Sequence, residues 1–218
     1  VLAAHDTAVG ASLAWIEKHG NLTRRGTDGV HQVDAQGLTV AVFRQHTSRT
    51  LDPQLHTHAV IWGKVQDATG KWLALDARWL LRQQRSISWV YDAALRTELQ
   101  QRLGVSWRPV PDGTGQSEIV GVPDHLLELF SQRSRQVDAK LADLVERWSA
   151  ENDGAEPDTP TMHDLERRAV LASRPNKAHG TDVEQLRRDW LARAGTTVNP
   201  TPAATDATVD PEVVIREA

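Results

Sequence analysis

Residues 43–58 read FRQHTSRTLDPQLHTH, and this stretch is the most informative part of the chain. It ends in a His-Thr-His triplet that leads into an apolar run, which predicts the start of a β-strand. Because side chains alternate between the two faces of a strand, His56 and His58 point the same way, about 7 Å apart along the chain. Two imidazoles on one face can bind a cation if a neighbouring strand supplies a third ligand, and Gln45 and His46 are upstream candidates. A metal ion on an open sheet face is suited to binding phosphates.

Short sequence motifs on both sides of this stretch, and within it, form a wider pattern. They include Thr47-Ser48-Arg49, Ala4-His5-Asp6, Gly70-Lys71-Trp72, Val90-Tyr91-Asp92-Ala93-Ala94-Leu95-Arg96-Thr97-Glu98-Leu99, Arg102-Leu103-Gly104-Val105, Gly121-Val122-Pro123 and Phe130-Ser131-Gln132-Arg133. The pattern resembles the signature of the conjugative relaxases of the TrwC/TraI (MobF) type, within the HUH endonucleases, over roughly residues 3 to 195. The resemblance implies a central antiparallel sheet that carries a metal, with helices that form a thumb over single-stranded DNA.

The resemblance also implies a metal site. In that family three histidines hold a divalent cation, and His56 and His58 stand where two of them are expected. The family pattern Phe-x-His-x-Thr-Ser-Arg has Gln45 in the third place here, with His46 one residue later. Three readings stay open. A one-residue bulge brings His46 to the metal, the amide oxygen of Gln45 binds it, or the site has two strong ligands and binds weakly. An amide oxygen suits Mg²⁺ or Mn²⁺ better than Zn²⁺.

The nucleophile of the family has no counterpart in this pattern. Relaxases of this family attack DNA with a tyrosine near the start of the protein, whereas the single tyrosine here, Tyr91, falls on the packing side of an expected long helix. We therefore expect no catalytic residue in this chain and no nicking by the chain alone. Residues 1–4 already read as the interior of a helix, so we expect the true beginning of the protein, with the nucleophile, to lie upstream.

Candidate DNA contacts are basic or aromatic. Arg49 either grips a phosphate or pairs with Asp52, and we favour the pairing slightly. Arg174 and Lys177 lie in an expected loop and are candidate phosphate contacts. Tryptophans can stack on bases, but core packing is the default reading for the seven considered, Trp62, Trp72, Trp79, Trp89, Trp107, Trp148 and Trp190.

Composition sets only broad limits. The chain has 218 residues, a net charge of −4 and no cysteine, which excludes disulfides and thiolate chemistry and fits a reducing compartment. Residues 1–100 hold 11 basic and 9 acidic side chains, and residues 101–218 hold 14 and 20, so a local basic surface is compatible with the total. No apolar run approaches the roughly 20 residues of a membrane span.

Hydrophobic spacing predicts an α+β fold, with a central antiparallel sheet backed by helices and followed by a helical extension. The expected strands are 38–44, 56–65 and 72–75, with a hairpin of 105–110 and 117–120. The expected helices are 3–19, a long one from Asp76 as N-cap to Leu103, 123–150, 161–173 and 180–194. We expect residues 1–195 to be a relaxase domain without its N-terminal part, and residues 196–218 to be a linker toward a following region.

The functional expectation follows from the resemblance. The chain is expected to be part of a bacterial, cytoplasmic relaxase that nicks and rejoins one DNA strand at a transfer origin during plasmid conjugation, with Mg²⁺ or Mn²⁺ as cofactor. Single-stranded DNA and a helicase region or other transfer proteins are the expected partners. Two other classes stay open: a degenerate single-stranded DNA-binding module that does not nick, and a metal-dependent phosphodiesterase that uses water.

Overall fold

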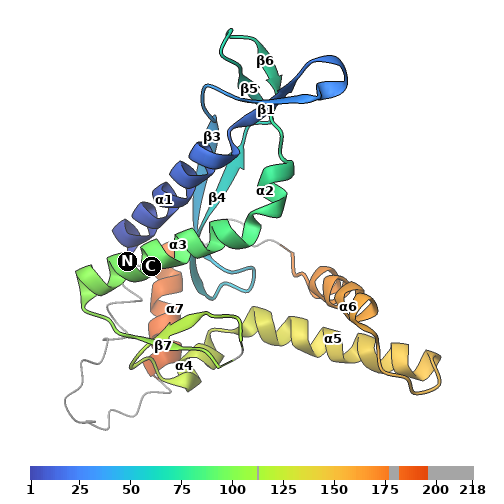
Figure 1. The fold of residues 1–218 in the computed structure, drawn as a ribbon. Coiled ribbons are helices and arrows are strands. Elements are labelled where there is room, and N and C mark those ends of the chain that lie inside the picture. Colours follow the sequence, from blue (N-terminus) through green and yellow to red (C-terminus); the bar gives the residue numbers. More distant parts are fainter. Residues whose placement is uncertain (112, 177–181, 196–218) are drawn as a thin grey trace. The chain divides into compact units, whose positions relative to one another are not determined.

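The computed structural model describes residues 1–111, 113–176 and 182–195. Contacts divide the chain into two compact units. The first holds residues 1–45 and 55–120, and the second holds residues 46–54 and the later chain from residue 121. Figure 1 shows the order of the elements. The expected linker lies outside the described residues.

Two helices form the body of the first unit. Helix α1 (Leu2–Gly20) packs along α3 (Gln84–Leu103), as Figure 1 shows. The buried side of α1 repeats every four residues with the small or apolar side chains Ala4, Ala8, Ser12 and Ile16. Small side chains at this spacing let the second helix approach closely. The expected helix over 3–19 is confirmed.

The expected single helix from Asp76 to Leu103 is wrong. It is divided at Gln83 into α2 (Arg78–Arg82) and α3. The indole of Trp79 on α2 lies 5.1 Å from that of Trp15, near the end of α1, so α2 is tied to one place on α1 while α3 runs along its length. The N-cap of α2 is Ala77 rather than Asp76. The Asp76 carboxylate accepts a long hydrogen bond from the backbone N–H of Arg78 (3.4 Å) and binds the Arg24 and Arg78 side chains, both at 2.8 Å.

The strands of the described residues pair two by two and antiparallel. They are β1 (Leu22–Arg25) with β2 (His31–Asp34), β3 (Val40–Thr47) with β4 (Pro53–Ile61), β5 (Lys64–Gln66) with β6 (Trp72–Ala74), and β7 (Trp107–Pro109) with β8 (Ser117–Ile119). A short 3₁₀ turn, η1 (Thr27–Gly29), connects β1 to β2. The expected strand 56–65 is two strands, because β4 ends before Trp62 and β5 begins at Lys64. Mixed helices and antiparallel strands confirm the predicted class.

The second unit is built from four helices and the turn at 46–54. The helices are α4 (Asp124–Leu129), α5 (Gln132–Glu151), α6 (Thr159–Ala172) and α7 (Val183–Gly195). Its core joins Leu126 of α4 to Leu186, Trp190 and Ala194 of α7, with Leu51 of the turn packed beside them. The sequence therefore places the tip of the β3–β4 hairpin in the helical unit.

The expected helix over 123–150 is also divided, at Phe130–Ser131. Its second part, α5, begins where the backbone N–H of Gln132 donates to the carboxylate of Asp52 (2.9 Å), and the Gln132 side chain donates to the same group (2.7 Å). Only the first N–H groups of a helix lack a partner within the helix and can bind an anion, so this hydrogen bond to Asp52 requires a helix to begin at Gln132. Long-range contact with the turn thus overrides the continuous apolar periodicity.

Candidate metal centre

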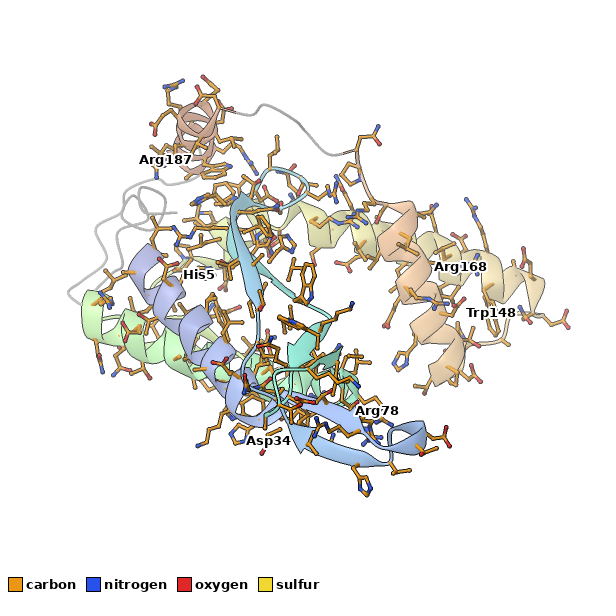
Figure 2. All side chains as sticks on the ribbon, turned by 90° about the horizontal axis from the view of Figure 1, so that it is seen from above. His5, Asp34, Arg78, Trp148, Arg168 and Arg187 are labelled. Carbon is orange, nitrogen blue, oxygen red and sulfur yellow. The ribbon has the colours of Figure 1, made fainter. Side chains whose placement is uncertain are left out.

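Helix α1 marks one face of the β3–β4 hairpin. His5 on α1 lies hydrogen-bonded to the hydroxyl of Thr57 on β4 (Nε2 to Oγ1, 2.7 Å), and Asp6 forms an ion pair with Arg44 on β3. Figure 2 shows His5 on the side of α1 that faces the hairpin. Arg44 and Thr57 therefore belong to the α1 face of the two strands.

The neighbours of these two residues lie on the other face. Gln45 is next to Arg44, so alternation puts its side chain on the face that points away from α1. His56 and His58 flank Thr57, so their side chains lie on that same face. The His56 and His58 rings share one face, since their centroids are 5.0 Å apart and the rings are nearly perpendicular.

The strand register gives the same result. The backbone N–H of Trp62 donates to the carbonyl of Thr39 (2.8 Å), and the register counted inward from this hydrogen bond puts Arg44 opposite Thr57 and Gln45 opposite His56. The contacts of Arg44 and Thr57 with α1 agree with this count. Directly opposed side chains have Cβ atoms about 5 Å apart, which is within the reach of a shared ion. Gln45, His56 and His58 are then neighbours on one face, and Gln45 and His56 are each partly exposed.

His46 follows the opposite alternation. At the turn, the N–H of Ser48 donates to the carbonyl of Asp52 (2.9 Å). Between this hydrogen bond and the one at Trp62, β3 has eight residues and β4 has nine, so the extra residue lies in β4 and β3 alternates without interruption. Uninterrupted alternation gives His46 the face of Arg44 rather than that of Gln45.

Among the described residues, no group of three or more His, Cys, Asp and Glu side chains is placed to hold a metal ion. An amide oxygen is outside that set, so the candidate ligands on the open face are two imidazoles and the Gln45 side chain. Neutral imidazole nitrogens and an amide oxygen all donate lone pairs to a cation, and partial exposure leaves coordination positions for water or a phosphate oxygen. The donor set fits a divalent ion.

Tyr91 lies on the α1 side. Its hydroxyl is hydrogen-bonded to Nδ1 of His5 (2.7 Å), and burial, reinforced by the nearby Asp92 carboxylate, raises the pKa of the phenol. A raised pKa disfavours the phenolate that attacks phosphorus. The sequence indicated packing for Tyr91, but it did not reveal that His5 bridges Tyr91 to Thr57 on β4.

The expected pairing of Arg49 with Asp52 is wrong. Asp52 is 2% exposed and accepts hydrogen bonds from Gln132 and from Arg193 (3.2 Å), while no hydrogen bond or ion pair joins it to Arg49 within the described part of the chain. Arg49 is partly exposed in the turn, and Arg174 is exposed after α6. Lys177 lies outside the described residues.

The tryptophans divide into two groups. Trp190 is buried and its indole N–H donates to the carbonyl of Leu51 (2.7 Å), as core packing predicts. Trp62, Trp72 and Trp89 are 59%, 56% and 41% exposed, so the prediction of core packing is wrong for these three.

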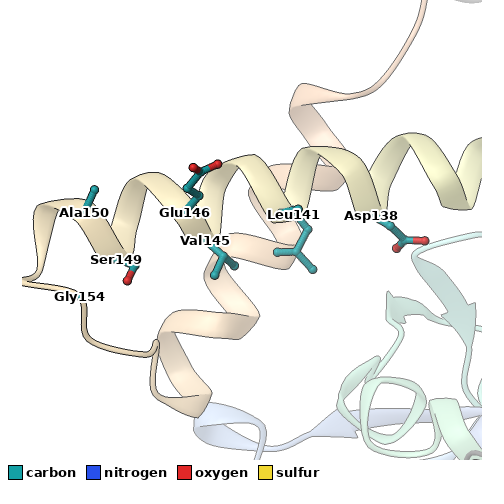
Figure 3. A pocket seen from close by; sticks show the side chains of 8 residues that line it. Asp138, Leu141, Val145, Glu146, Ser149, Ala150 and Gly154 are labelled. Carbon is teal, nitrogen blue, oxygen red and sulfur yellow. The ribbon is translucent and has the colours of Figure 1, made fainter.

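A cavity of about 870 Å³ lies along α5 in the second unit (Figure 3). Its lining is apolar around Leu141 and Val145, with the carboxylates of Asp138 and Glu146 and without a basic side chain. Acidic groups repel phosphate, so this cavity is a poor site for DNA.

None of the described helices is long and apolar enough to cross a membrane.

A family model described as TrwC relaxase matches residues 1–197. Two curated proteins named multifunctional conjugation protein TraI, from Escherichia coli and from its strain K12, are 32% and 31% identical over 144 residues, which is 62% of this chain and 8% of theirs. The chain thus spans a small part of the length of these relatives.

Solved structures of the conjugative relaxase TrwC are similar to this chain. The metal-bound complex with oriT DNA has a TM-score of 0.72 at 31% identity, and it covers 89% of this chain and 63% of the TrwC chain. A copper-bound complex with oriT DNA has a TM-score of 0.71 at 30% identity, with 89% and 62% covered. A complex with a 27-mer DNA that holds the recognition hairpin and the cleavage site has a TM-score of 0.70 at 31% identity, with 89% and 64% covered.

Proposed function

Because the chain belongs to the TrwC relaxase family, we propose that it forms the metal- and DNA-binding part of a DNA relaxase. The parent enzyme nicks and rejoins one strand at a transfer origin by metal-assisted transesterification during conjugation. The single observation that carries this proposal is the contact between the His56 and His58 rings on β4, and the contacts of Thr57 and Arg44 with α1 support placing Gln45 on the same face. The complexes of TrwC with oriT DNA, two of them metal-bound, support the choice of substrate.

Gln45, His56 and His58 would hold the divalent ion, with Mg²⁺ or Mn²⁺ favoured by the amide oxygen. When bound, the ion supplies Lewis acidity that polarises the scissile phosphodiester and offsets charge on the breaking P–O bond. The chain itself orients these side chains, because α1 anchors β4 through Thr57 and β3 through Arg44. His46, whose alternation is opposite, is not a ligand in this proposal.

Arg49, Arg174 and Lys177 bind DNA phosphates in this proposal. For Arg49 the supporting observation is that Asp52 is occupied by Gln132 and Arg193, which leaves the guanidinium available to an anion. Arg174 is supported by its exposure after α6. Lys177 is proposed from its place in the sequence.

The attacking tyrosine is not Tyr91 in this proposal, and the 218 residues contain no other. Tyr91 is supported as a structural residue by its hydrogen bond to His5 on the α1 side. Residues 1–195 then form part of the relaxase domain, and the family match over residues 1–197 supports this extent. A helicase region or other transfer proteins in the bacterial cytoplasm are the proposed partners.

The test uses a single-stranded oligonucleotide of the transfer origin with Mn²⁺. The full gene product should form a covalent protein–DNA band that survives denaturation, and the 218-residue chain should bind the strand without forming this band. Cleaved ends without an adduct from the full gene product would indicate hydrolysis by water and contradict the transesterification. Absence of DNA binding by both proteins would reject the proposal as a whole.

A further inference from the structure

A cavity of about 340 Å³ lies at the far end of the same hairpin, in the first unit. It is lined by the side chains of Thr39, Trp62, Lys64 and Trp72. None of these residues has a part in the proposed metal site or in the proposed phosphate contacts. The cavity is large enough for a flat ring system the size of a nucleobase.

Strand register explains why these side chains meet. In the β5–β6 hairpin Lys64 pairs with Ala74 and Gln66 pairs with Trp72, so Lys64 and Trp72 share one face as diagonal neighbours. The opposite face carries Val65, which is 1% exposed and fills the interior. Trp62 lies two residues before β5 begins, and its backbone N–H donates to the carbonyl of Thr39. This hydrogen bond holds Trp62 and Thr39 together at the cavity.

Both indoles are more than half exposed, which is unfavourable in water unless something covers them. A tryptophan side chain normally buries about 150–250 Å² and dominates the energetics of the surface where it lies. Two exposed indoles around one cavity therefore mark a binding surface rather than incomplete folding, because the neighbouring Val65 is completely packed.

Charge identifies the class of ligand. The exposed ammonium of Lys64 forms no ion pair with a carboxylate in the parts of the chain that the structure describes. A cation beside two aromatic faces matches a nucleotide of a single strand, in which the base offers a π-face and the backbone offers a phosphate.

The cavity lies at the end of the hairpin that carries the proposed metal face. Arg44 and Thr57 both contact α1, so the extra residue of β4 lies between the turn and Thr57. Alternation from Thr57 onward then puts Trp62, just past the end of β4, on the same side as His56 and His58. Trp62 follows His58 by four residues, which is about 13 Å along an extended strand. A single strand held by its phosphate at the histidines can extend over this distance to the tryptophans.

We propose that Trp62 and Trp72 stack on one unpaired nucleobase of the bound strand and that Lys64 binds its phosphate. The proposal rests on the proposed function, since it assigns a base-binding subsite to the same DNA strand. Stacking on aromatic rings tolerates any base, so this subsite adds affinity and fixes the position of the strand rather than reading its sequence.

The experiment compares two probes of equal length, a labelled oligothymidylate and a strand of the same backbone in which every base is absent. Fluorescence anisotropy measures their affinities for the wild-type 218-residue chain and for Trp62→Ala, Trp72→Ala and Lys64→Gln. Each tryptophan variant should bind oligothymidylate roughly 5- to 100-fold more weakly, and it should bind the abasic strand like the wild type. Lys64→Gln should weaken binding of both strands.

Two controls keep the result interpretable. Trp62→Phe keeps an aromatic face and should retain most of the affinity, and Leu81→Ala removes a side chain that is 66% exposed on α2, outside the cavity, and should change nothing. Unchanged affinity of both tryptophan variants for oligothymidylate, or an equal loss on the abasic strand, would overturn the subsite while the proposed function stands. A change of oligomeric state without a change in DNA binding would instead make the cavity an interface between copies. A wild type that binds the transfer-origin strand but neither of these two probes would also overturn the subsite, whereas a wild type that does not bind the transfer-origin strand would contradict the proposed function itself.

Discussion

Gln45 shows what one residue decides in this chain. Alternation along a strand was sufficient to predict from sequence that His56 and His58 share a face, and their ring contact agrees. The choice between Gln45 and His46 was not available from sequence, because it depends on which neighbours contact α1. The contacts of Arg44 with Asp6 and of Thr57 with His5 supply that information and favour Gln45.

Tyr91 and His5 give a prediction at the residue scale. Tyr91→Phe removes the hydroxyl that is hydrogen-bonded to the buried His5 ring and leaves that nitrogen without this partner. We expect the free energy of unfolding in urea to fall by about 1–3 kcal/mol. Thr7→Ala, which removes an exposed hydroxyl on α1, is the control and should change it by less than about 0.5 kcal/mol.

The same variant separates a structural role from a catalytic one. Tyr91→Phe in the full gene product should still form the covalent DNA band. A variant with wild-type stability that has lost this band would show Tyr91 to be the attacking group and the structural assignment to be wrong.

At the scale of elements, periodicity predicted the positions of most helices but not their interruptions. Apolar spacing runs through Gln83 and through Phe130–Ser131, yet both long helices are divided there. The causes are the tryptophan contact between α1 and α2 and the anion at the start of α5. Both are long-range contacts, which local sequence patterns do not contain.

Asp52 gives a prediction for the turn of the second unit. Asp52→Ala removes the group that binds Gln132 at the start of α5 and Arg193 on α7. Because Arg193 stays partly exposed, we expect a moderate loss of roughly 2 kcal/mol in the free energy of unfolding. Tryptophan fluorescence during urea unfolding measures it. Asp164→Asn removes an exposed pair with Arg167 and should cost less than about 1 kcal/mol; equal effects of the two variants would contradict the role of Asp52.

Asp67 gives a pH prediction for the β5–β6 hairpin. Hydrogen bonds from Thr69, first from its hydroxyl, lower the pKa of Asp67 from 3.8 to about 2, with Lys71 and Arg25 as further contributors. A carboxyl with a lowered pKa stabilises the fold above its unfolded pKa, and this contribution is lost as pH falls through the folded pKa. The melting temperature should therefore fall between about pH 4 and pH 2.

Asp67→Asn tests this assignment, because the amide does not titrate. The variant should lose stability at neutral pH and show a flatter dependence of melting temperature on pH in the acid range. Asp138→Asn, an exposed position on α5, is the control and should follow the wild-type curve. An Asp67→Asn curve parallel to the wild type would exclude Asp67 as a source of acid sensitivity.

For the whole molecule, the resemblance predicted the family and the α+β class. It could do so because residues 43–58 contain the histidine motif that is typical of the family. Sequence did not predict that the chain forms two units or that the hairpin tip at 46–54 belongs to the second. It also did not predict the exposed Trp62 and Trp72, because the spacing of a tryptophan in a strand does not tell which face of the sheet is covered.

Salt dependence gives a prediction for the whole chain, despite its net charge of −4. Affinity for single-stranded DNA should fall linearly with salt on logarithmic axes, and Arg49→Gln should reduce the slope by about 0.7 if Arg49 binds one phosphate. Arg188→Gln is the matched control, since Arg188 is hydrogen-bonded to Gln185 on an exposed side of α7. A slope that is equal for wild type and Arg49→Gln would remove Arg49 from the DNA interface.

The central claim, that Gln45 with His56 and His58 binds a divalent ion, is tested most directly by calorimetric titration of Mn²⁺ into the 218-residue chain. The wild type should bind one ion, Gln45→Ala should bind it at least about tenfold more weakly, and His46→Ala should bind it like the wild type. Loss of affinity in His46→Ala together with wild-type affinity in Gln45→Ala would contradict the claim, and so would a wild type that binds no Mn²⁺.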